Sequence, residues 1–324
     1  MPGPYETIRA VIQFENLTKT FRVHQKEPGL KGSLHALWRR KYLDKQALKS
    51  VSAKIEAGEI VGLVGANGAG KTTLVKLLSG IIHPTSGSAD VLGFKPWERR
   101  AEFRRQIALI MGQKAQLWWD LPAADCFLLL REIYRIPHEK FKRSLDELVE
   151  ALGVKDQLKI QIRRLSLGER MKMELIAALV HEPKVVYLDE PTIGLDLTAQ
   201  RAIREFLLEY RRRHRPAMIL TSHYMEDIES LCERLMIIRE GSIVYDGGLK
   251  KILSEHGGRK QIIARLSKMD DQGRTEIRLE VPRDRVAETA AEVLKTHAVA
   301  DLAIEEEDIG VLIERLIRQG LATS

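Results

Sequence analysis

The chain has 324 residues, of which 44% are hydrophobic and 30% are charged. This length suits one larger domain and a small one, and the composition argues against intrinsic disorder and against an integral membrane protein, because no apolar run approaches the roughly 20 residues that a membrane-spanning helix needs. The net charge of +7 suits nucleic acid, an anionic membrane surface or a phosphorylated ligand, and by itself selects none of them.

The N-terminus and the cysteines bear on location. The segment MPGPYETIRA lacks the basic-then-apolar pattern of a secretory signal. Two cysteines, Cys126 and Cys232, are too few for a disulfide framework. We therefore expect a reducing, cytoplasmic environment.

A basic stretch interrupts the first strands. VIQFENL (11–17) alternates like a strand and leads to Phe21, and strand-like sequence resumes at ALKSVSAKIEAGEIVGLVG. The intervening residues 24–46 look inserted, and residues 24–50 carry seven Lys or Arg against two acids. Within this stretch four apolar residues share one helical face: Leu30, Leu34, Leu37 and Trp38. Two interpretations stay open, a helix docked on the core or a helix that binds a membrane surface or a partner.

The remainder predicts two domains. From Glu59 to about Tyr245, strand-like runs alternate with amphipathic segments, which indicates an α/β fold. VVYLD and AMILTS are almost entirely apolar, as expected for parallel strands covered on both faces. HGGRK (256–260) reads as a linker, after which the pattern is β, β, α, β, α. We therefore predict a large domain over 1–257 and a small α+β domain over 258–324.

A glycine-rich loop predicts a phosphate site. GANGAGKT (65–72) matches G-x-x-x-x-G-K-[ST] between an apolar strand and a helix, so backbone N–H groups and the positive helix end can meet phosphate oxygens. Lys71 is expected to reach the β- and γ-phosphates, and Thr72 to supply a hydroxyl to Mg²⁺. A glycine-rich turn with a surface lysine is the alternative. The predicted binding residues are Gly65, Asn67, Gly68, Ala69, Gly70, Lys71, Thr72 and Thr73.

Two adjacent acids end the apolar strand VVYLD. Neighbouring residues on a strand point to opposite faces, so Asp189 and Glu190 are expected to have different roles. We predict that Asp189 serves Mg²⁺ and that Glu190 positions the water that attacks the γ-phosphate. A free surface pair is the alternative.

The segment LSLGER (165–170) precedes a long apolar stretch, MKMELIAALV. Ser166 and Glu169 have the spacing of a capping box, which predicts a helix start and requires no ligand. Gly168 is left unexplained, because a glycine in a helical turn costs about 1 kcal/mol.

Taken together, the phosphate loop, YLDEPTIGLD and LSLGE resemble, in order and approximate spacing, the nucleotide-binding subunit of an ATP-binding-cassette (ABC) transporter over roughly residues 8–255. The resemblance implies a P-loop ABC ATPase fold, with a parallel core sheet, an antiparallel β subdomain and a helical subdomain at about 115–182. It also implies ATP as substrate, with Mg²⁺.

The resemblance implies further site residues. Gln113 is similar to the family's Q-loop glutamine, which touches Mg²⁺ and the attacking water, and Asp196 to its D-loop aspartate. His223 is similar to the switch histidine on the γ-phosphate; capping of the next helix is the alternative. Phe21 would stack on adenine, unless the insertion lets Tyr42 replace it.

LSLGER resembles the family's signature, LSGGQ, which contacts the ATP held by the other subunit. Leu167 and Glu169 depart from that pattern, and a carboxylate should repel phosphate unless it is turned away. We predict that Ser166 and the Gly168 N–H face the γ-phosphate while Glu169 stays in the capping box.

A signature that acts in the other subunit implies a head-to-tail homodimer. Transport would need separately encoded membrane permease subunits, which would hold this chain at the cytoplasmic face of the cell membrane. We expect them to dock near Gln113–Pro122, where Trp118 and Trp119 lie beside Leu117 and Leu121. Two core tryptophans are the alternative.

Details such as LLSGIIHPTSGSADVLGF resemble bacterial exporters of the drug and multidrug class, with polysaccharide or glycolipid export as the runner-up. A soluble ABC ATPase that acts on nucleic acid or ribosomes is a different class. Tandem cassettes and coiled-coil or zinc insertions, which are typical of that class, are missing from the sequence, so we expect no nucleic acid. A cassette that binds ATP without hydrolysing it is opposed by the intact Lys71, Asp189, Glu190 and His223.

Overall fold

The computed structural model describes residues 10–24, 42–112, 115–256, 259–269, 273–306 and 309–319. The chain divides into two compact units, Met1–Asp246 and Gly247–Ser324. The second unit therefore begins before the linker at 256–260 and includes a helix that the sequence pattern assigned to the larger domain.

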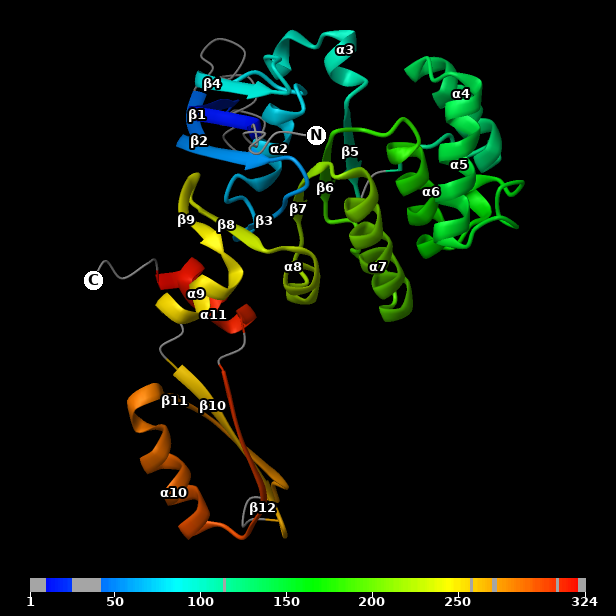
Figure 1. The fold of residues 1–324 in the computed structure, drawn as a ribbon. Coiled ribbons are helices and arrows are strands. Elements are labelled where there is room, and N and C mark those ends of the chain that lie inside the picture. The colour runs from blue at the N-terminus through cyan, green and yellow to red at the C-terminus, as the bar shows by residue number, and fades with distance from the viewer. Residues whose placement is uncertain are drawn as a thin grey trace, which may run out of the picture. The chain divides into compact units, whose positions relative to one another are not determined.

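The larger unit is built on a mostly parallel sheet with the strand order β5-β6-β7-β3-β8-β9 (Figure 1). Each pair from β5 across to β8 is parallel. The strands β3 and β7 are buried along their whole length, as the apolar runs predicted. The bounds are β3 Ile60–Val64, β5 Ile107–Met111, β6 Val185–Asp189, β7 Ala217–Thr221, β8 Arg234–Arg239 and β9 Ser242–Gly248.

An antiparallel sheet, β2-β1-β4, forms a second layer. It consists of β1 (Ala10–His24), β2 (Tyr42–Glu56) and β4 (Ser86–Val91). The pairing of β1 with β2 continues to His24 and Tyr42, so residues 42–46 of the predicted insertion extend a strand. Residues 25–41, with the predicted apolar face of Leu30, Leu34, Leu37 and Trp38, lie outside the described residues.

The helix α2 (Lys71–Leu78) joins the two layers. Its buried Leu74, Leu77 and Leu78 belong to one cluster with Phe14 and Val51 of the antiparallel sheet. The same cluster contains residues of the central sheet, Val61, Leu63, Tyr187, Ile219 and Met236. Because β3 and α2 both pack in this cluster, the loop that joins them is fixed at both ends.

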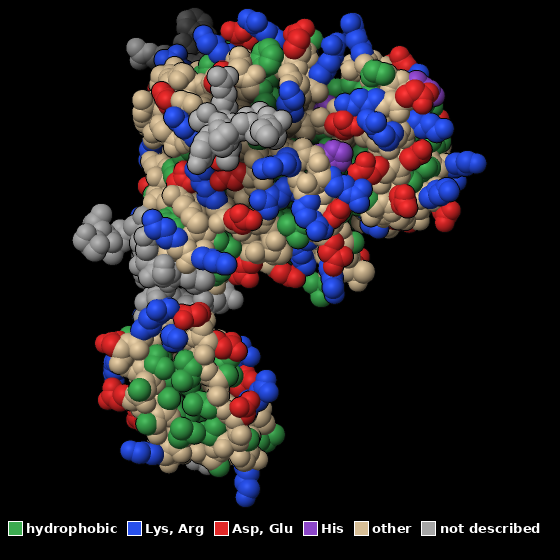
Figure 2. Space-filling model, viewed as in Figure 1, with side chains coloured by type: hydrophobic (Ala, Val, Ile, Leu, Met, Phe, Trp, Pro, Cys, Tyr) green, Lys and Arg blue, Asp and Glu red, His purple; other side chains and the backbone are tan. Residues whose placement is uncertain are grey.

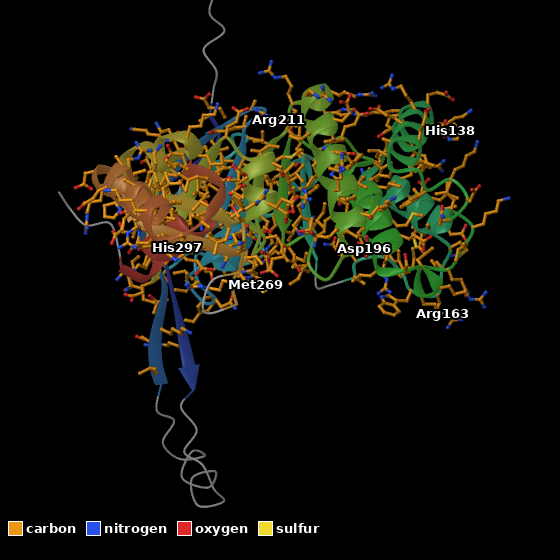
Figure 3. All side chains as sticks on the ribbon, turned by 90° about the horizontal axis from the view of Figure 1, so that it is seen from below. His138, Arg163, Asp196, Arg211, Met269 and His297 are labelled. Carbon is orange, nitrogen blue, oxygen red and sulfur yellow. The ribbon has the colours of Figure 1, made fainter. Side chains whose placement is uncertain are left out.

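Helices form the rest of the larger unit: α3 (Ala101–Arg104), α4 (Ala123–Tyr134), α5 (His138–Leu152), α6 (Leu167–Leu179), α7 (Leu197–His214) and α8 (Met225–Leu231). In Figure 1, α4, α5 and α6 lie together beside the β5 edge, within the range predicted for the helical subdomain. In Figure 3, the labelled Asp196 directly precedes α7 and the labelled Arg211 lies in its last turn. None of the described helices is both long and apolar enough to span a membrane.

The second unit contains α9 (Leu249–His256), β10 (Arg259–Leu266), β11 (Glu276–Pro282), α10 (Val286–Thr296), β12 (Val299–Glu306) and α11 (Ile309–Gln319). The antiparallel sheet has the order β11-β10-β12. The α10 residues Ala290 and Val293 pack against Ile262 and Ala264 of the central strand. Figure 2 shows hydrophobic side chains gathered on one face of this sheet and helix. The β, β, α, β, α order matches the prediction.

One buried histidine is expected to make the stability of the larger unit sensitive to pH. His181 follows α6, is 7% exposed and stacks on Tyr134 with ring centroids 4.0 Å apart. Its Nε2 lies 3.1 Å from the Ile107 carbonyl oxygen, whereas its buried Nδ1 has no hydrogen-bond partner among the described residues. Burial lowers the pKa of His181 from 6.5 to about 4. The folded protein therefore holds this ring neutral.

Stability should fall between pH 6.5 and pH 4 because of this ring. The folded-state pKa is depressed, so the unfolded chain binds the proton first; stability is complete above about pH 6.5, and roughly 2 kcal/mol is lost at pH 5. Replacing His181 with Gln keeps an N–H donor and removes the titrating ring. The free energy of unfolding, measured in urea at pH 7 and at pH 5, should therefore fall less between the two pH values in the variant than in the wild type. The matched control is His138→Gln on the exposed start of α5, which should change nothing. An unaltered loss at pH 5 in His181→Gln would contradict this assignment.

Candidate active site

The phosphate loop is held in place by close backbone contacts. A Cβ at Gly65 would lie 2.2 Å from the Ile238 carbonyl oxygen, and one at Gly70, whose φ is +119°, would lie 2.6 Å from that of Ala47. Only glycine fits either position without displacing a neighbouring strand. Between them the loop is exposed at residues 66–68, which include Asn67 and Gly68, while Ala69 is buried.

Lys71 closes the loop from inside. Its Nζ donates to the carbonyl oxygens of Gly65 at 2.5 Å and of Ala66 at 3.3 Å. Burial lowers the pKa of Lys71, and the negative charges of Glu190 and Asp189 oppose this effect. The ammonium group thus lies within electrostatic reach of both predicted acids. Because α2 begins at Lys71, the unpaired N–H groups of its first turn, including those of Thr72 and Thr73, belong to the same loop.

Asp189, at the end of β6, lies between two hydroxyl groups. It is paired in register with Thr221 of β7, whose Oγ1 donates to Asp189 Oδ1 at 2.6 Å. The Thr72 hydroxyl donates to Asp189 Oδ2 at 3.4 Å. The structure therefore brings together the two described side chains that the sequence assigns to Mg²⁺. One carboxylate and one hydroxyl are the hard oxygen donors that Mg²⁺ accepts alongside substrate phosphates and water.

Glu190 does not continue the strand. Its φ is +57°, a left-handed conformation, and its N–H donates to Thr221 O at 3.0 Å and to Thr221 Oγ1 at 3.2 Å. The alternation of side chains along a strand, which was predicted here, therefore does not extend to Glu190, although the two acids do have different partners. The Glu190 Oε1 atom lies 2.8 Å from Nε2 of His223, at the end of the next strand of the sheet.

The polypeptide before Gln113 approaches the acids closely. The Gly112 N–H donates to Asp189 O at 2.9 Å, and a Cβ at Gly112 would lie 1.9 Å from the Glu190 carbonyl oxygen. Gln113 itself lies outside the described residues. After it, the Gln116 and Leu117 N–H groups donate to the Glu174 carboxylate of α6, at 2.8 and 3.2 Å.

The capping box predicted for LSLGER is confirmed. The Ser166 N–H donates to Glu169 Oε2 at 2.9 Å, and the Glu169 N–H donates to Ser166 Oγ at 3.2 Å. The Ser166 N–H lowers the pKa of the Glu169 carboxyl, with further contributions from the Ser166 hydroxyl and the Gln157 amide. The carboxylate is therefore ionised and tied back to the helix start, while the Ser166 side chain lies at the surface.

Gly168 lies against the start of α7. A Cβ at Gly168 would lie 3.2 Å from the Ala199 Cβ, and the Leu167 Cδ2 would lie 3.4 Å from a Cβ at Gly194. Asp196 caps α7 by accepting the Ala199 N–H at 2.9 Å. The predicted signature and D-loop segments therefore pack on each other within one chain. Close packing is a use of Gly168 that the sequence did not reveal.

Phe21 and the tryptophans lie at the surface. The Phe21 ring is 36% exposed and has the Lys19 Nζ 5.0 Å from its centroid. The structure describes no side chain for Tyr42, the predicted alternative. Trp118 and Trp119 are 43% and 49% exposed, so the alternative of two core tryptophans was wrong.

Sequence reasoning missed Thr221 and Gly112. Thr221 directly precedes Ser222 and His223 in the sequence, at the end of an apolar strand. Only the strand order, which puts β7 beside β6, shows that its hydroxyl meets Asp189. Gly112 needed the same tertiary information.

Comparisons with known proteins agree on one family. The family model "ABC transporter" matches residues 48–193, and "EvrA-like ABC transporter, C-terminal domain" matches residues 260–305. The ABC transporter ATP-binding protein NatA of Bacillus subtilis is 31% identical over 217 residues, which are 66% of this chain and 88% of NatA. The linearmycin resistance ATP-binding protein LnrL of Bacillus subtilis is 31% identical over 220 residues, or 68% of this chain and 70% of LnrL.

The Nod factor export ATP-binding protein I of Burkholderia pseudomallei is 33% identical over 219 residues, which are 68% of this chain and 71% of that protein. Among solved structures, an ATP-binding subunit of an ABC transporter superposes with a TM-score of 0.63 at 23% identity, covering 76% of this chain and 93% of the other. A dimeric cassette in a post-hydrolysis state with ADP and Pi gives 0.60 at 21% identity, covering 73% and 98%. These two likenesses show the fold.

The geometry and the relatives lead to the same answer. Three features meet at one end of the parallel sheet. They are the phosphate loop with Lys71 bonded to its carbonyl oxygens, the Asp189 carboxylate beside Thr72, and the Glu190 carboxylate paired with His223. The fold predicted from the sequence is confirmed. The chain belongs to the ABC transporter ATP-binding proteins and is an ATP-hydrolysing subunit of that family.

Proposed function

We propose that two copies of this chain bind two ATP molecules with Mg²⁺ between them, head to tail, and that closure and hydrolysis drive export through separately encoded membrane subunits at the cytoplasmic face of the membrane. The observation that carries the proposal is the 2.8 Å contact between Glu190 and His223, next to Asp189 and the phosphate loop. Export is supported by relatives whose names refer to linearmycin resistance and Nod factor export.

In this proposal the loop residues bind the phosphates. When ATP binds, Lys71 Nζ would give up its hydrogen bonds to the carbonyl oxygens of Gly65 and Ala66 and would donate to β- and γ-phosphate oxygens instead. Hydrogen bonds between two charged groups are stronger than those to neutral carbonyls. The backbone N–H groups from Gly68 to Thr73 complete the cradle, with Asn67 and Ala69 in the same loop. Thr72, Asp189 and Gln113 would hold Mg²⁺, which neutralises developing charge on the phosphates.

Glu190 and His223 would perform the chemistry. Glu190 accepts a proton from the attacking water, while His223 holds the Glu190 carboxylate and hydrogen-bonds the γ-phosphate. The partner copy contributes Ser166, the Gly168 N–H and Asp196 from its signature and D-loop, which lie together in each chain. Phe21 would stack on the adenine ring. A single copy therefore holds an incomplete site.

Replacing Glu190 with Gln should stop turnover and keep binding. The amide oxygen can still accept a hydrogen bond from His223 Nε2, but it cannot act as a base, so kcat should fall about 100- to 10,000-fold. With ATP and Mg²⁺ the variant should form a stable dimer, measured by size-exclusion chromatography with light scattering. Glu102→Gln on the exposed surface of α3 is the control and should hydrolyse ATP normally. A monomer at saturating ATP, even with the membrane subunits present, would sink the proposal.

Replacing Glu169 with Gln should leave ATPase activity near normal or raise it. Gln can make the same capping box, and the change removes a negative charge near the helix tip that would face the partner's nucleotide. Steady-state ATPase assays test this, with Ser166→Ala expected to lower the rate because it removes both the cap and the phosphate contact. Loss of activity in Glu169→Gln would show that the carboxylate acts on the nucleotide.

Replacing Trp118 and Trp119 with Ala should weaken binding to the membrane subunits. Both rings are nearly half exposed next to the buried Leu117, and large aromatic side chains of this kind anchor interfaces. Co-purification with the membrane subunits should fall while basal ATPase activity of the isolated chain stays within about twofold. Leu294→Ala, which removes an exposed apolar side chain in the second unit, is the control. Unchanged co-purification of the double variant would place the docking surface elsewhere.

A further inference from the structure

A fully buried carboxylate lies behind the proposed catalytic pair. Asp227, on α8, has no exposed surface. Its Oδ1 accepts a hydrogen bond from Arg204 Nη1 at 2.9 Å. Its Oδ2 accepts the hydroxyl of Ser222 at 2.7 Å and the hydroxyl of Thr192. Arg204, Thr192 and Ser222 are themselves buried, so the four side chains form a buried polar cluster inside the larger unit.

Each donor to Asp227 belongs to a segment that carries a proposed site residue. Thr192 follows Glu190 by two positions, and Ser222 directly precedes His223. Arg204 lies two turns along α7 from Asp196, which caps that helix. The Asp227 carboxylate therefore connects three parts of the chain: the segment that follows Glu190, the segment that contains His223, and the helix α7, which Asp196 caps.

Local hydrogen bonds make these connections short and stiff. The Ile193 N–H donates to Glu190 O at 3.3 Å and the Leu195 N–H to Thr192 O at 3.2 Å, so the turn from Glu190 to Leu195 is bonded internally. Ser222 Oγ, besides donating to Asp227, accepts the Tyr224 N–H at 3.0 Å, so the backbone is held on both sides of His223. A shift of the carboxylate would move both segments.

We propose that Asp227 is a positioning residue for ATP hydrolysis, because it sets the distance between Glu190 and His223 and ties both to α7. The inference rests on the roles proposed above for Glu190 and His223. Those two side chains come from the ends of different strands and meet at 2.8 Å, a contact that a small displacement of either segment breaks. A misplacement of about 1 Å around a reacting centre can cost on the order of 100-fold in rate.

The alternative role for this cluster is stability alone. The arginine and the two hydroxyl donors offset the desolvation cost of the buried carboxylate, and removal of any one of them leaves a buried polar group without its partner. Such a role would lower the melting temperature and leave kcat unchanged at temperatures where the protein stays folded. The two roles therefore make different predictions for turnover.

The test replaces Asp227 with Asn in the full-length protein. The amide nitrogen has the size of Oδ2 and cannot accept the hydroxyls of Thr192 and Ser222. We expect kcat to fall about 10- to 100-fold. The KM for ATP should stay within about twofold, because Lys71 hydrogen-bonds within the phosphate loop, to Gly65 O and Ala66 O, and ground-state binding by this loop is retained.

The chain offers a matched control on the same helix. Glu226 is the neighbour of Asp227 and also pairs with Arg204, at 2.7 Å, but its side chain is 66% exposed. Glu226→Gln removes the negative charge of one of the two carboxylates that pair with Arg204, and it leaves Thr192 and Ser222 unchanged. It should therefore leave kcat unchanged. All assays are run well below the melting temperature that is measured for each variant.

Two further variants keep the test decisive if Asp227→Asn does not fold. Thr192→Val and Ser222→Ala each remove one hydroxyl and retain the carboxylate with its arginine. Each should lower kcat at constant KM, and the double variant should lose less than the product of the single losses, because both hydroxyls act through one oxygen. Folded Asp227→Asn with wild-type kcat, or single hydroxyl variants with wild-type kcat, would overturn the proposal.

The outcome for Glu190→Gln separates this inference from the proposed function. If Glu190→Gln still hydrolyses ATP at the wild-type rate, the roles of the catalytic pair are wrong and the proposal for Asp227 falls with them. If Glu190→Gln is inactive and folded Asp227→Asn is fully active, the catalytic pair stands and only the positioning role of Asp227 is overturned.

Discussion

The backbone turn at Glu190 is the constraint on which the site depends. A left-handed conformation at a residue with a Cβ costs about 1 kcal/mol or more. Two interactions hold it here: the Glu190 N–H bonds both oxygens of Thr221, and Gly112 leaves room for the Glu190 carbonyl. Without this turn the chain would continue β6, and the Glu190 side chain would point to the opposite face of the sheet from Asp189. With it, the carboxylate meets His223. Strain held in this way is common where a site must be preorganised.

The parallel sheet explains why these segments meet at all. In parallel strands the carboxyl ends lie on one edge, and the neighbouring strands β6, β7 and β3 end in the acids, in Thr221 and in the phosphate loop respectively. Thr221 therefore lies on the strand between the acids and the loop, where its one hydroxyl can donate to Asp189 and accept from Glu190. The strand order thus turns three sequence-distant segments into one site.

The sequence allowed prediction of everything that depends on local spacing. Short-range patterns predicted the phosphate loop, the two acids, the capping box of Ser166 and Glu169, and the order of elements in the second unit, and the structure shows them.

The sequence did not allow prediction of β4, because Ser86–Val91 contains only two apolar residues and forms a strand by pairing with β1. Thr221, Gly112 and Asp227 were missed for a related reason: their partners are far away in sequence, and only the strand order and helix packing bring them close. The roles of Gln113, Phe21 and the signature residues stay predictions, since each depends on a ligand or a second copy.

The helix α6 shows how the departures of its predicted signature from LSGGQ fit this chain. Glu169, which replaces the glutamine, makes the hydrogen bonds that glutamine would make in a capping box, and its charge is turned back toward Ser166 and Gln157. Leu167, which replaces a glycine, lies against Gly194 in the predicted D-loop segment, so this position has a packing role within the chain.

The same helix also contacts the segment after Gln113. Glu174 accepts the Gln116 N–H, and the guanidinium of Arg170 lies 4.9 Å from the Trp119 ring. Trp119, at the proposed docking surface, therefore contacts the same helix whose tip carries Ser166, the residue proposed to face the nucleotide of a second copy.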